Sequence, residues 1–215
     1  MKKFRSPFTQ AFDQLPDTLP IFPLEGAVLF PGGSLPLNIF EPRYLNMAQD
    51  ALQTHRLVGM IQPRDQQRVP ALCDVGCAGR ITKYLETSDG RLEIVLSGVC
   101  RFQIKREMDT VRGYRLVVPD WSGFETDYDE QTVSESAVAM LHAALRAYFE
   151  THDIDAYWKL LDEIDPEVQV NMLPGSLSLA SEDKQLLLEA SNLEERARAF
   201  TAVLAGEEKT SAKQH

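Results

Sequence analysis

No stretch of this 215-residue chain is long and apolar enough to cross a bilayer, which takes roughly 18 consecutive apolar residues. The N-terminus is basic, as in a secretory signal, but four polar residues interrupt the apolar core that should follow: Gln10, Asp13, Gln14 and Asp17. Cysteine is also scarce, and the three cysteines cannot all pair within the chain. These absences predict a cytoplasmic protein with reduced thiols and no membrane partner.

Motifs that would indicate catalysis or cofactor binding are missing as well. A phosphate-binding loop of the form G-x-x-x-x-G-K-[ST] does not occur. The segment 174–178 resembles a nucleophile elbow, but it lacks the second glycine of G-x-S-x-G and follows no convincing strand, which favours a helix-ending turn. We therefore expect no catalytic residues and no cofactor.

The cysteines could be considered as zinc ligands, since Cys73 and Cys77 are closely spaced and Cys100 could be a third. A structural zinc site needs about four ligands, however, and the four histidines show no paired ligand spacing. We interpret the cysteines as buried free thiols and expect no metal site.

Positive charge is scarce in the second part of the chain. Residues 1–120 hold 15 Lys and Arg against 13 Asp and Glu, a net charge of +2, whereas residues 121–215 hold 7 against 19, a net charge of −12. Such a split indicates two segments with different surfaces. Because an acidic surface repels phosphate backbones, any nucleic acid would have to bind the first segment.

Hydrophobic residues in the first segment follow the period of β-strands. Strands are expected at 19–24, 35–40, 57–61, 79–85, 91–96, 102–104 and 114–118. Prolines in the run 19–24 favour an edge position, and Asp89-Gly90 predicts a hairpin. Pro42 suits the first turn of a helix in which Leu45, Ala48 and Leu52 form an apolar stripe. The pattern predicts a closed or nearly closed mixed β barrel with one inserted helix.

After an acidic segment that carries turn-forming residues, the hydrophobic period changes to about 3.6. Helices are expected at 133–149 and 157–164, at 168–173 before Pro174, from a Ser181 cap, and from an Asn192 cap to 204. We predict an N-terminal extension at 1–17, a β lobe at 18–120, an acidic linker at 121–130, a helical lobe at 131–205 and a disordered tail at 206–215. The predicted fold class is α+β, a mixed β pseudobarrel followed by a helical bundle.

One long string carries a family resemblance. LPIFPLEGAVLFPGGSLPLNIFEPRY, at 19–44, resembles the opening of the N-terminal domain of Lon proteases. It is especially similar to the single-domain bacterial versions and to the corresponding part of cereblon. The similarity continues at 56–60, 75–81, 89–98, 101–104, 183–190 and 193–196, so it covers about residues 18–205.

The resemblance implies a PUA-like pseudobarrel and a helical bundle that recognise protein substrates or unfolded peptide segments. In Lon the ATPase and the Ser-Lys peptidase lie downstream, in domains that this sequence does not resemble. The expected function is therefore a non-catalytic protein-binding module, an adaptor in proteolysis or quality control. The oligomeric state stays open, because assembly of the Lon ring depends mainly on other segments. RNA or small-ligand binding on the barrel is the alternative.

Three aromatic residues of the acidic linker, Trp121, Phe124 and Tyr128, are the candidate peptide-binding residues. Aromatic side chains gain much from burial, about 150–250 Å² each, so one interpretation is that they fold back and pin the two lobes together. The functional interpretation is that they line a groove for an extended peptide.

Two further groups carry both a structural and a functional interpretation. Glu41, Pro42, Arg43 and Tyr44 could contact a ligand, but they suit the start of a helix, with Arg43 paired locally and Tyr44 packed. Five basic residues could gather on one hairpin and bind RNA: Arg101, Lys105, Arg106, Arg112 and Arg115. Alternating charges are usually a solvated face, and only Tyr114 lies near for base stacking, which argues against nucleic acid.

Overall fold

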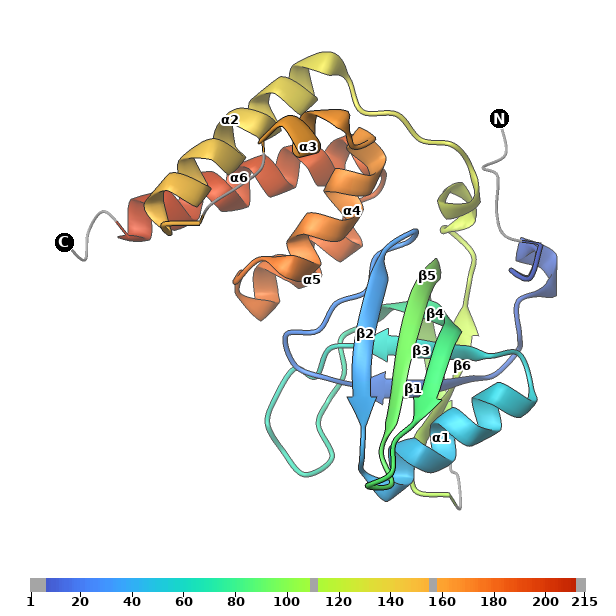
Figure 1. The fold of residues 1–215 in the computed structure, drawn as a ribbon. Helices are drawn as coiled ribbons and strands as arrows, with labels where there is room; N and C mark the ends of the chain where they lie inside the picture. The colour runs from blue at the N-terminus through green and yellow to red at the C-terminus, as the bar shows by residue number, and fades with distance from the viewer. Residues whose placement is uncertain (1–6, 109–111, 155–157, 212–215) are drawn as a thin grey trace. The chain divides into compact units, whose positions relative to one another are not determined.

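The computed structural model describes residues 7–108, 112–154 and 158–211 and shows a mixed α+β fold (Figure 1). The chain divides into two compact units, residues 1–130 and 131–215. We call them the β unit and the helical unit. Among the described residues, no helix is long and apolar enough to cross a membrane.

Six strands of the β unit form one sheet in the order β2-β5-β4-β3-β1-β6, and β5 also pairs with β6. Their bounds are β1 Leu19–Pro23, β2 Ser34–Ile39, β3 Leu57–Ile61, β4 Val75–Glu86, β5 Leu92–Met108 and β6 Arg115–Asp120. β5 has 17 residues, so its first part can pair with β2 and its last part with β6. The sheet therefore closes on itself through β5, β4, β3, β1 and β6, and β2 is an added edge strand.

The prediction of an edge position for the first strand is wrong, because β1 lies between β3 and β6. Its prolines are tolerated because Pro20 is registered only with β6 and Pro23 only with β3, whereas Ile21 has partners on both sides. Neither proline therefore lies where β1 is paired on both sides. Close packing also explains a glycine: a Cβ at Gly98 would lie 1.9 Å from the carbonyl oxygen of Phe30.

The inserted helix α1 spans Pro42–Gln53 and begins as predicted, with Glu41 at the N-cap and Pro42 in the first turn. Its buried stripe is Tyr44, Met47, Ala48 and Ala51. The predicted stripe is wrong at both leucines, because Leu45 and Leu52 are only half-buried. Relative to the prediction, the helix is rotated about its axis, so that the face with Tyr44, Met47 and the two alanines is the buried one.

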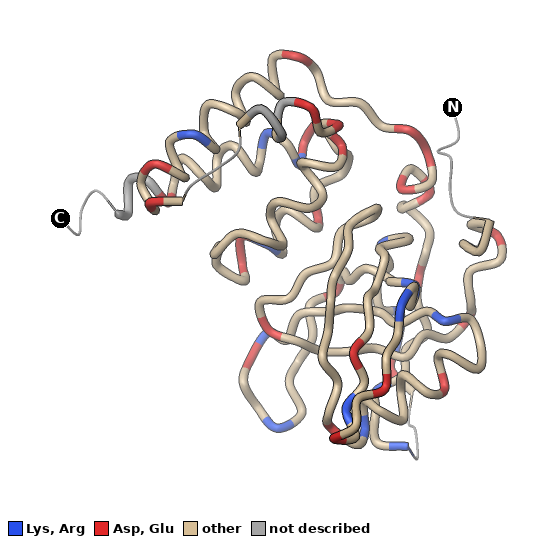
Figure 2. Tube along the Cα trace, in the orientation of Figure 1, with Lys and Arg blue, Asp and Glu red and all other residues tan. Residues whose placement is uncertain are grey.

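The helical unit contains α2 Glu135–Thr151, α3 Trp158–Glu163, α4 Pro166–Ser176, α5 Ser181–Glu189 and α6 Leu193–Ser211. Figure 2 shows that acidic positions outnumber basic ones along this unit. A polar cluster lies inside it. The Arg196 guanidinium donates to the Asn171 amide oxygen at 2.6 Å and to the Leu187 carbonyl at 2.9 Å. His142 and Gln169 are hydrogen bonded at 2.8 Å.

Several predicted helix ends are corrected. Pro174 lies inside α4, because a proline near the C-terminal end removes only one backbone bond and the Leu177 N–H still reaches the Leu173 carbonyl. Ala180, not Ser181, occupies the N-cap of α5. The cap at Asn192 is confirmed, since its side chain accepts from the Glu195 N–H at 2.9 Å.

The predicted start of the disordered tail is also wrong. Helix α6 continues to Ser211, past Gly206. A single glycine in a helix is unfavourable by only about 1 kcal/mol, and the glutamates and lysine that follow are good helix formers. Residues 212–215 lie outside the described part of the chain.

Candidate functional site

The acidic segment after β6 is fixed to the barrel by a buried ion pair. The Asp127 carboxylate accepts from the Arg101 backbone N–H at 2.9 Å and from its guanidinium at 2.9–3.2 Å. Both side chains are 1% exposed. Arg101 also lies over the Phe124 ring, 4.9 Å from its centroid. The interpretation of Arg101 as part of a solvated face is therefore wrong, because a carboxylate distant in sequence neutralises it inside the protein.

The three aromatic candidates pack against the barrel core. Trp121 donates from Nε1 to the Pro16 carbonyl at 3.1 Å, and its ring meets Phe102 edge-on. Tyr128 donates its hydroxyl to the Gln10 carbonyl at 3.0 Å, and Phe124 is half-buried beside them. Within the β unit these rings thus hold residues 10–16 and the acidic segment against the sheet. A contact with peptide stays a prediction for all three.

Most of the basic residues considered for RNA are engaged with carboxylates. Besides Arg101 with Asp127, the pairs are Lys105 with Asp120 at 3.3 Å, Arg112 with Asp50 at 2.9 Å and Arg115 with Glu107 at 2.5 Å. Four of the five cations are thereby partly neutralised. A phosphate backbone would have to displace these internal partners, which weakens the case for RNA on this hairpin.

A shallow apolar groove of about 550 Å³ lies on strands β2, β4 and β5. Residues directly opposite each other in an antiparallel ladder share a face of the sheet. The register therefore builds two cross-strand rows on the outer face. One row is Pro36, Val95 and Lys83, and the other is Asn38, Glu93 and Leu85.

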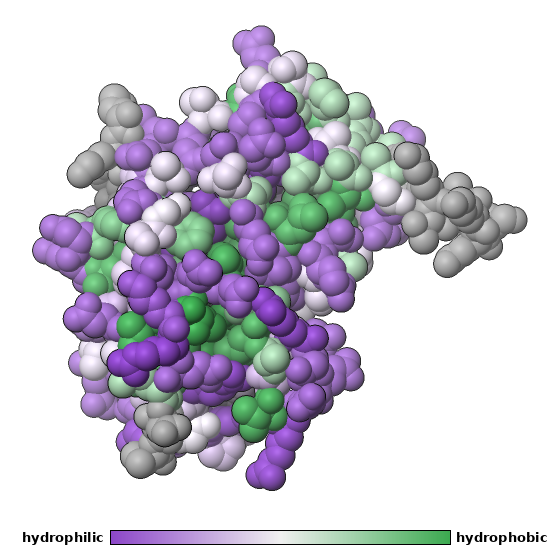
Figure 3. All heavy atoms as spheres, turned by 180° about the vertical axis from the view of Figure 1, so that it is seen from behind, coloured by the Kyte–Doolittle hydropathy of each residue, from purple (hydrophilic) through white to green (hydrophobic). Residues whose placement is uncertain are grey.

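The floor of the groove is apolar and exposed. Leu85 is 61% exposed, and Pro36 lies open to solvent on the edge strand. Lys83 and Glu93 supply one charge of each sign to the lining. Beside the groove, a bulge at Thr82 is fixed by its hydroxyl, which donates to the Val95 carbonyl at 3.1 Å. Seen from behind, the molecule shows apolar patches set among hydrophilic side chains (Figure 3).

Strand β2 pairs with β5 alone among the described strands, but its open edge is blunted. Gly98 donates to the Gly33 carbonyl, so the ladder bonds toward β5 fall at 33, 35, 37 and 39. The backbone N–H and C=O groups of Ser34, Pro36 and Asn38 then point to the open edge, where Pro36 has no N–H to donate. A proline in the middle of an open edge hinders addition of another strand. A peptide on this surface is better accommodated across the face than along the edge.

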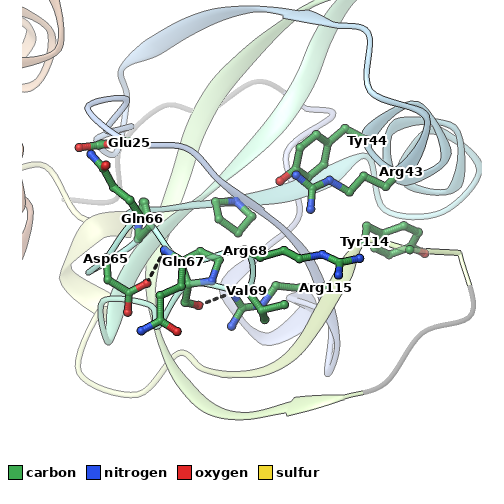
Figure 4. A pocket seen from close by; sticks show the side chains of 14 residues that line it. Glu25, Arg43, Tyr44, Asp65, Gln66, Gln67, Arg68, Val69, Tyr114 and Arg115 are labelled. Atoms are coloured by element: carbon green, nitrogen blue, oxygen red, sulfur yellow. Dashed lines mark hydrogen bonds between the residues drawn. The ribbon is translucent and has the colours of Figure 1, made fainter.

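A second pocket, of about 490 Å³, lies between the end of β1, the start of α1, the segment 63–70 and the start of β6. Figure 4 shows Glu25, Asp65 and two glutamines at one end and Arg43, Tyr44, Arg68 and Tyr114 at the other. Arg115 fixes one wall by donating to the Pro70 carbonyl at 2.7 Å. The two ends of the pocket thus carry opposite charge.

The residues at the start of α1 behave as the structural interpretation predicts. Arg43 pairs with Glu41 at 2.8 Å and lies over the Tyr44 ring, 4.5 Å from its centroid. Tyr44 packs on Phe22 with ring centroids 4.1 Å apart, and burial raises the pKa of its hydroxyl. Both residues nevertheless line the second pocket, so one contact that stabilises the helix start also shapes a cavity.

The serine and the cysteines that were considered for catalysis or metal binding lie in positions that a structural role explains. Ser176 donates its hydroxyl to the Met172 carbonyl in the last turn of α4, which confirms a helix end there. Cys77 and Cys100 are buried free thiols, as predicted, but Cys73 is half-exposed. Within the described residues, no three His, Cys, Asp or Glu side chains are grouped so that they could hold a metal ion.

Comparison with known proteins identifies the family of this chain. The model of the ATP-dependent protease La (Lon) substrate-binding domain matches residues 18–205. The chain belongs to the Lon substrate-binding domain family. Lon protease of Parabacteroides distasonis is 27% identical over 208 residues, which cover 92% of this chain and 25% of that protein. Lon protease of Roseiflexus castenholzii is 27% identical over 210 residues, 91% of this chain and 25% of that protein. The chain thus spans about a quarter of the length of these relatives.

Solved structures of the family have the same fold. A Lon N-terminal domain protein from Xanthomonas campestris superposes with a TM-score of 0.64 at 24% identity, covering 86% of this chain and 97% of that one. The N-terminal domain of Lon protease from the Mycobacterium avium complex gives a TM-score of 0.59 at 17% identity, covering 87% and 98%. These matches confirm the predicted α+β fold, and the family model confirms the predicted family.

The hydrophobic pattern of the sequence does not predict the apolar groove. The alternation predicts that Leu85 and Val95 belong to strands, but it does not show which face of a strand is covered. The missing information is the register of β2 against β5, which brings Pro36 of a distant strand beside Val95.

Proposed function

We propose that this chain is a non-catalytic recognition module that binds extended, apolar segments of substrate proteins. The observation that carries the proposal is the exposed groove on the outer face of β2, β5 and β4, in a chain whose family is that of the Lon substrate-binding domain. An apolar surface of this kind gains free energy when it is covered, and it needs no reacting group.

The occupant that fits is a peptide in extended conformation with aliphatic or aromatic side chains. Lys83 and Glu93 allow either sign of charge at its margins, so binding depends on apolar side chains rather than on net charge. Because Pro36 blunts the open edge, the peptide crosses the outer face and does not extend the sheet. An adaptor role in proteolysis or quality control follows from this binding if the captured segment is passed to a protease.

The test is the affinity for two synthetic peptides of equal length, one alternating Leu and Ser and one of Gly and Ser only. We expect the protein to bind the first peptide more tightly. Leu85→Arg should weaken that binding by about tenfold, because it places a charge in the apolar floor. Fluorescence anisotropy with a labelled peptide measures both effects.

A matched control lies in the helical unit. Leu186 is 53% exposed, close to the 61% of Leu85, and Leu186→Arg should leave peptide affinity unchanged. Equal binding of both peptides, or an equal loss in the two leucine variants, would refute the groove as the binding surface.

The contact predicted for Trp121, Phe124 and Tyr128 is tested in the same assay. Trp121→Phe keeps an aromatic side chain at this position but removes the Nε1 bond to Pro16 and part of the ring surface. If the linker aromatics bind peptide, this variant lowers the affinity without a change at the groove. If they only anchor the segment, the affinity stays at the wild-type value.

A further inference from the structure

The second pocket of the β unit has features that the apolar groove lacks. Its acidic end is formed by Glu25 and Asp65, and its basic end by Arg43 and Arg68 (Figure 4). Pro23, Pro63 and Pro70 add apolar surface to the lining. A volume of about 490 Å³ is large enough for a few amino-acid residues.

The two arginines at the basic end differ in how they are engaged. Arg43 shares its charge with Glu41 and is 48% exposed. Arg68 makes no ion pair within the described part of the chain, and Figure 4 shows its side chain extending toward Tyr114. A free guanidinium at the end of a pocket is a donor fork for an anion.

The charges nearby favour a singly charged anion. Asp65 uses its carboxylate to accept from the Gln67 and Ala71 N–H groups at 3.0 and 3.3 Å, so it stays inside the pocket as fixed negative charge. Glu25 adds a second negative charge at that end. Arg43 is paired with Glu41 and Arg115 with Glu107, so Arg68 is left as one guanidinium without an ion pair within the described residues. Its charge matches the single charge of a carboxylate better than the roughly double charge of a phosphate.

We propose that this pocket binds the carboxylate of a peptide, with the anionic group at Arg68 and Arg43 and an apolar side chain against the prolines. The acidic end fixes the direction, because it repels a carboxylate that enters the other way round. The site lies on β1, α1, the segment 63–70 and β6, away from the residues of the apolar groove, so it stands or fails independently of that groove.

The experiment uses the full 215-residue chain and three forms of a short peptide, Ser-Gly-Ala-Ser-Leu, labelled with an uncharged dye. One form has a free C-terminal carboxylate, the second is amidated, and the third is amidated with Asp before the Leu. We expect the amide to bind about tenfold more weakly than the free acid, since a charge-assisted hydrogen bond is lost. Binding of the third form identifies a side-chain carboxylate as a second source of the same group.

Variants locate the contact. Arg68→Gln should weaken the free acid by about tenfold and leave the amide unchanged. Arg106→Gln removes an exposed arginine elsewhere on the β unit and should change neither. For Arg43→Gln the matched control is Arg91→Gln, since Arg91 is 50% exposed and pairs with Asp89, also two residues before it. Unchanged unfolding midpoints confirm that the variants are folded.

Three results would overturn the proposal. The first is equal affinity for the acid and the amide in the wild-type protein, which needs no variant. The second is an Arg68→Gln affinity equal to that of the wild type. The third is displacement of the peptide by inorganic phosphate at lower concentration than by acetate, which would assign the pocket to phosphate.

Discussion

An arginine is buried in each unit of this chain, and each is held by residues that lie far from it in the sequence or on another helix. Arg101 of the β unit faces a carboxylate, Asp127, through several hydrogen bonds. Arg196 of the helical unit donates to the Asn171 amide oxygen and to the Leu187 carbonyl. Removing Asp127 leaves the Arg101 charge buried without this carboxylate, whereas removing Arg196 takes the charge itself away and leaves the Asn171 and Leu187 oxygens without this donor. The two units should therefore respond differently to loss of one partner.

In each unit the buried arginine binds residues of other secondary-structure elements. Asp127 lies beyond the last strand, so the barrel is completed by a segment that composition alone marks as a linker. In the helical unit the partners come from α4 and α5, and they join three helices around one guanidinium. Burial of a polar group thus fixes the position of a neighbouring element in both cases.

The largest effect is expected for Asp127→Asn. This change keeps the shape but removes the charge that compensates Arg101, so we expect a loss of about 3–5 kcal/mol of unfolding free energy in the β unit. The chain has two tryptophans, Trp121 in the β unit and Trp158 in the helical unit. Urea unfolding followed by fluorescence in a Trp158→Phe background reports the β unit alone.

A double variant separates charge from packing. Arg101→Met with Asp127→Leu replaces the pair by apolar side chains, and most of the lost stability should return. If the double variant is as unstable as Asp127→Asn, the geometry of the hydrogen bonds matters more than the uncompensated charge.

Arg196→Met should have a smaller effect, confined to the helical unit. It leaves the Asn171 amide oxygen and the Leu187 carbonyl without this donor, which is unfavourable by about 1–3 kcal/mol. Fluorescence of Trp158 in a Trp121→Phe background follows this unit. A loss as large as that of Asp127→Asn would contradict the distinction between leaving a charge buried without its carboxylate and removing the charge.

Tyr128→Phe removes one hydrogen bond, from the hydroxyl to the Gln10 carbonyl, and leaves the ring against Phe12. We expect a loss of about 1 kcal/mol in the β unit and no change in peptide affinity. Tyr84→Phe is the matched control for the stability measurement alone, since Tyr84 is 55% exposed but lines the apolar groove. An equal effect of the two variants would show that the tether to residues 10–16 adds no stability.

Much of the fold could be predicted because local patterns were clear. The run 57–61, the Asp89-Gly90 hairpin and the cap at Asn192 each depend on neighbouring residues, and the structure confirms them. Local patterns mislead at Arg101, which they place on a solvated face, and they do not show the groove at Pro36. Their environment comes from residues far away in the sequence, such as Asp127 for Arg101 and Val95 for Pro36. The pairing of distant elements is not encoded in local periodicity.

The smallest effect is expected from Glu194, and it depends on pH. Glu194 accepts from the Ser134 backbone N–H at 2.8 Å and from its hydroxyl at 2.9 Å, and it also accepts from Arg198. These bonds, with those from Ser134 first, lower the pKa of the carboxyl below its ordinary value of 4.5. A lowered pKa in the folded state stabilises the fold above that ordinary value, and the contribution is lost as the pH falls through the folded-state pKa.

Glu194→Gln should therefore lower the urea midpoint of the helical unit at neutral pH, and the difference from the wild type should vanish on acidification below pH 4.5. The measurement is Trp158 fluorescence in the Trp121→Phe background across the acidic range. Glu195→Gln is the control, because it removes a charge from the same turn of α6 but none of the bonds to Ser134. If the two glutamine variants give the same pH profile, the charge near the helix N-terminus matters and the bridge from α6 to the start of α2 does not. If only Glu194→Gln shows the acid-dependent difference, a carboxylate stabilises the helical unit from its surface, whereas in the β unit it does so from the interior.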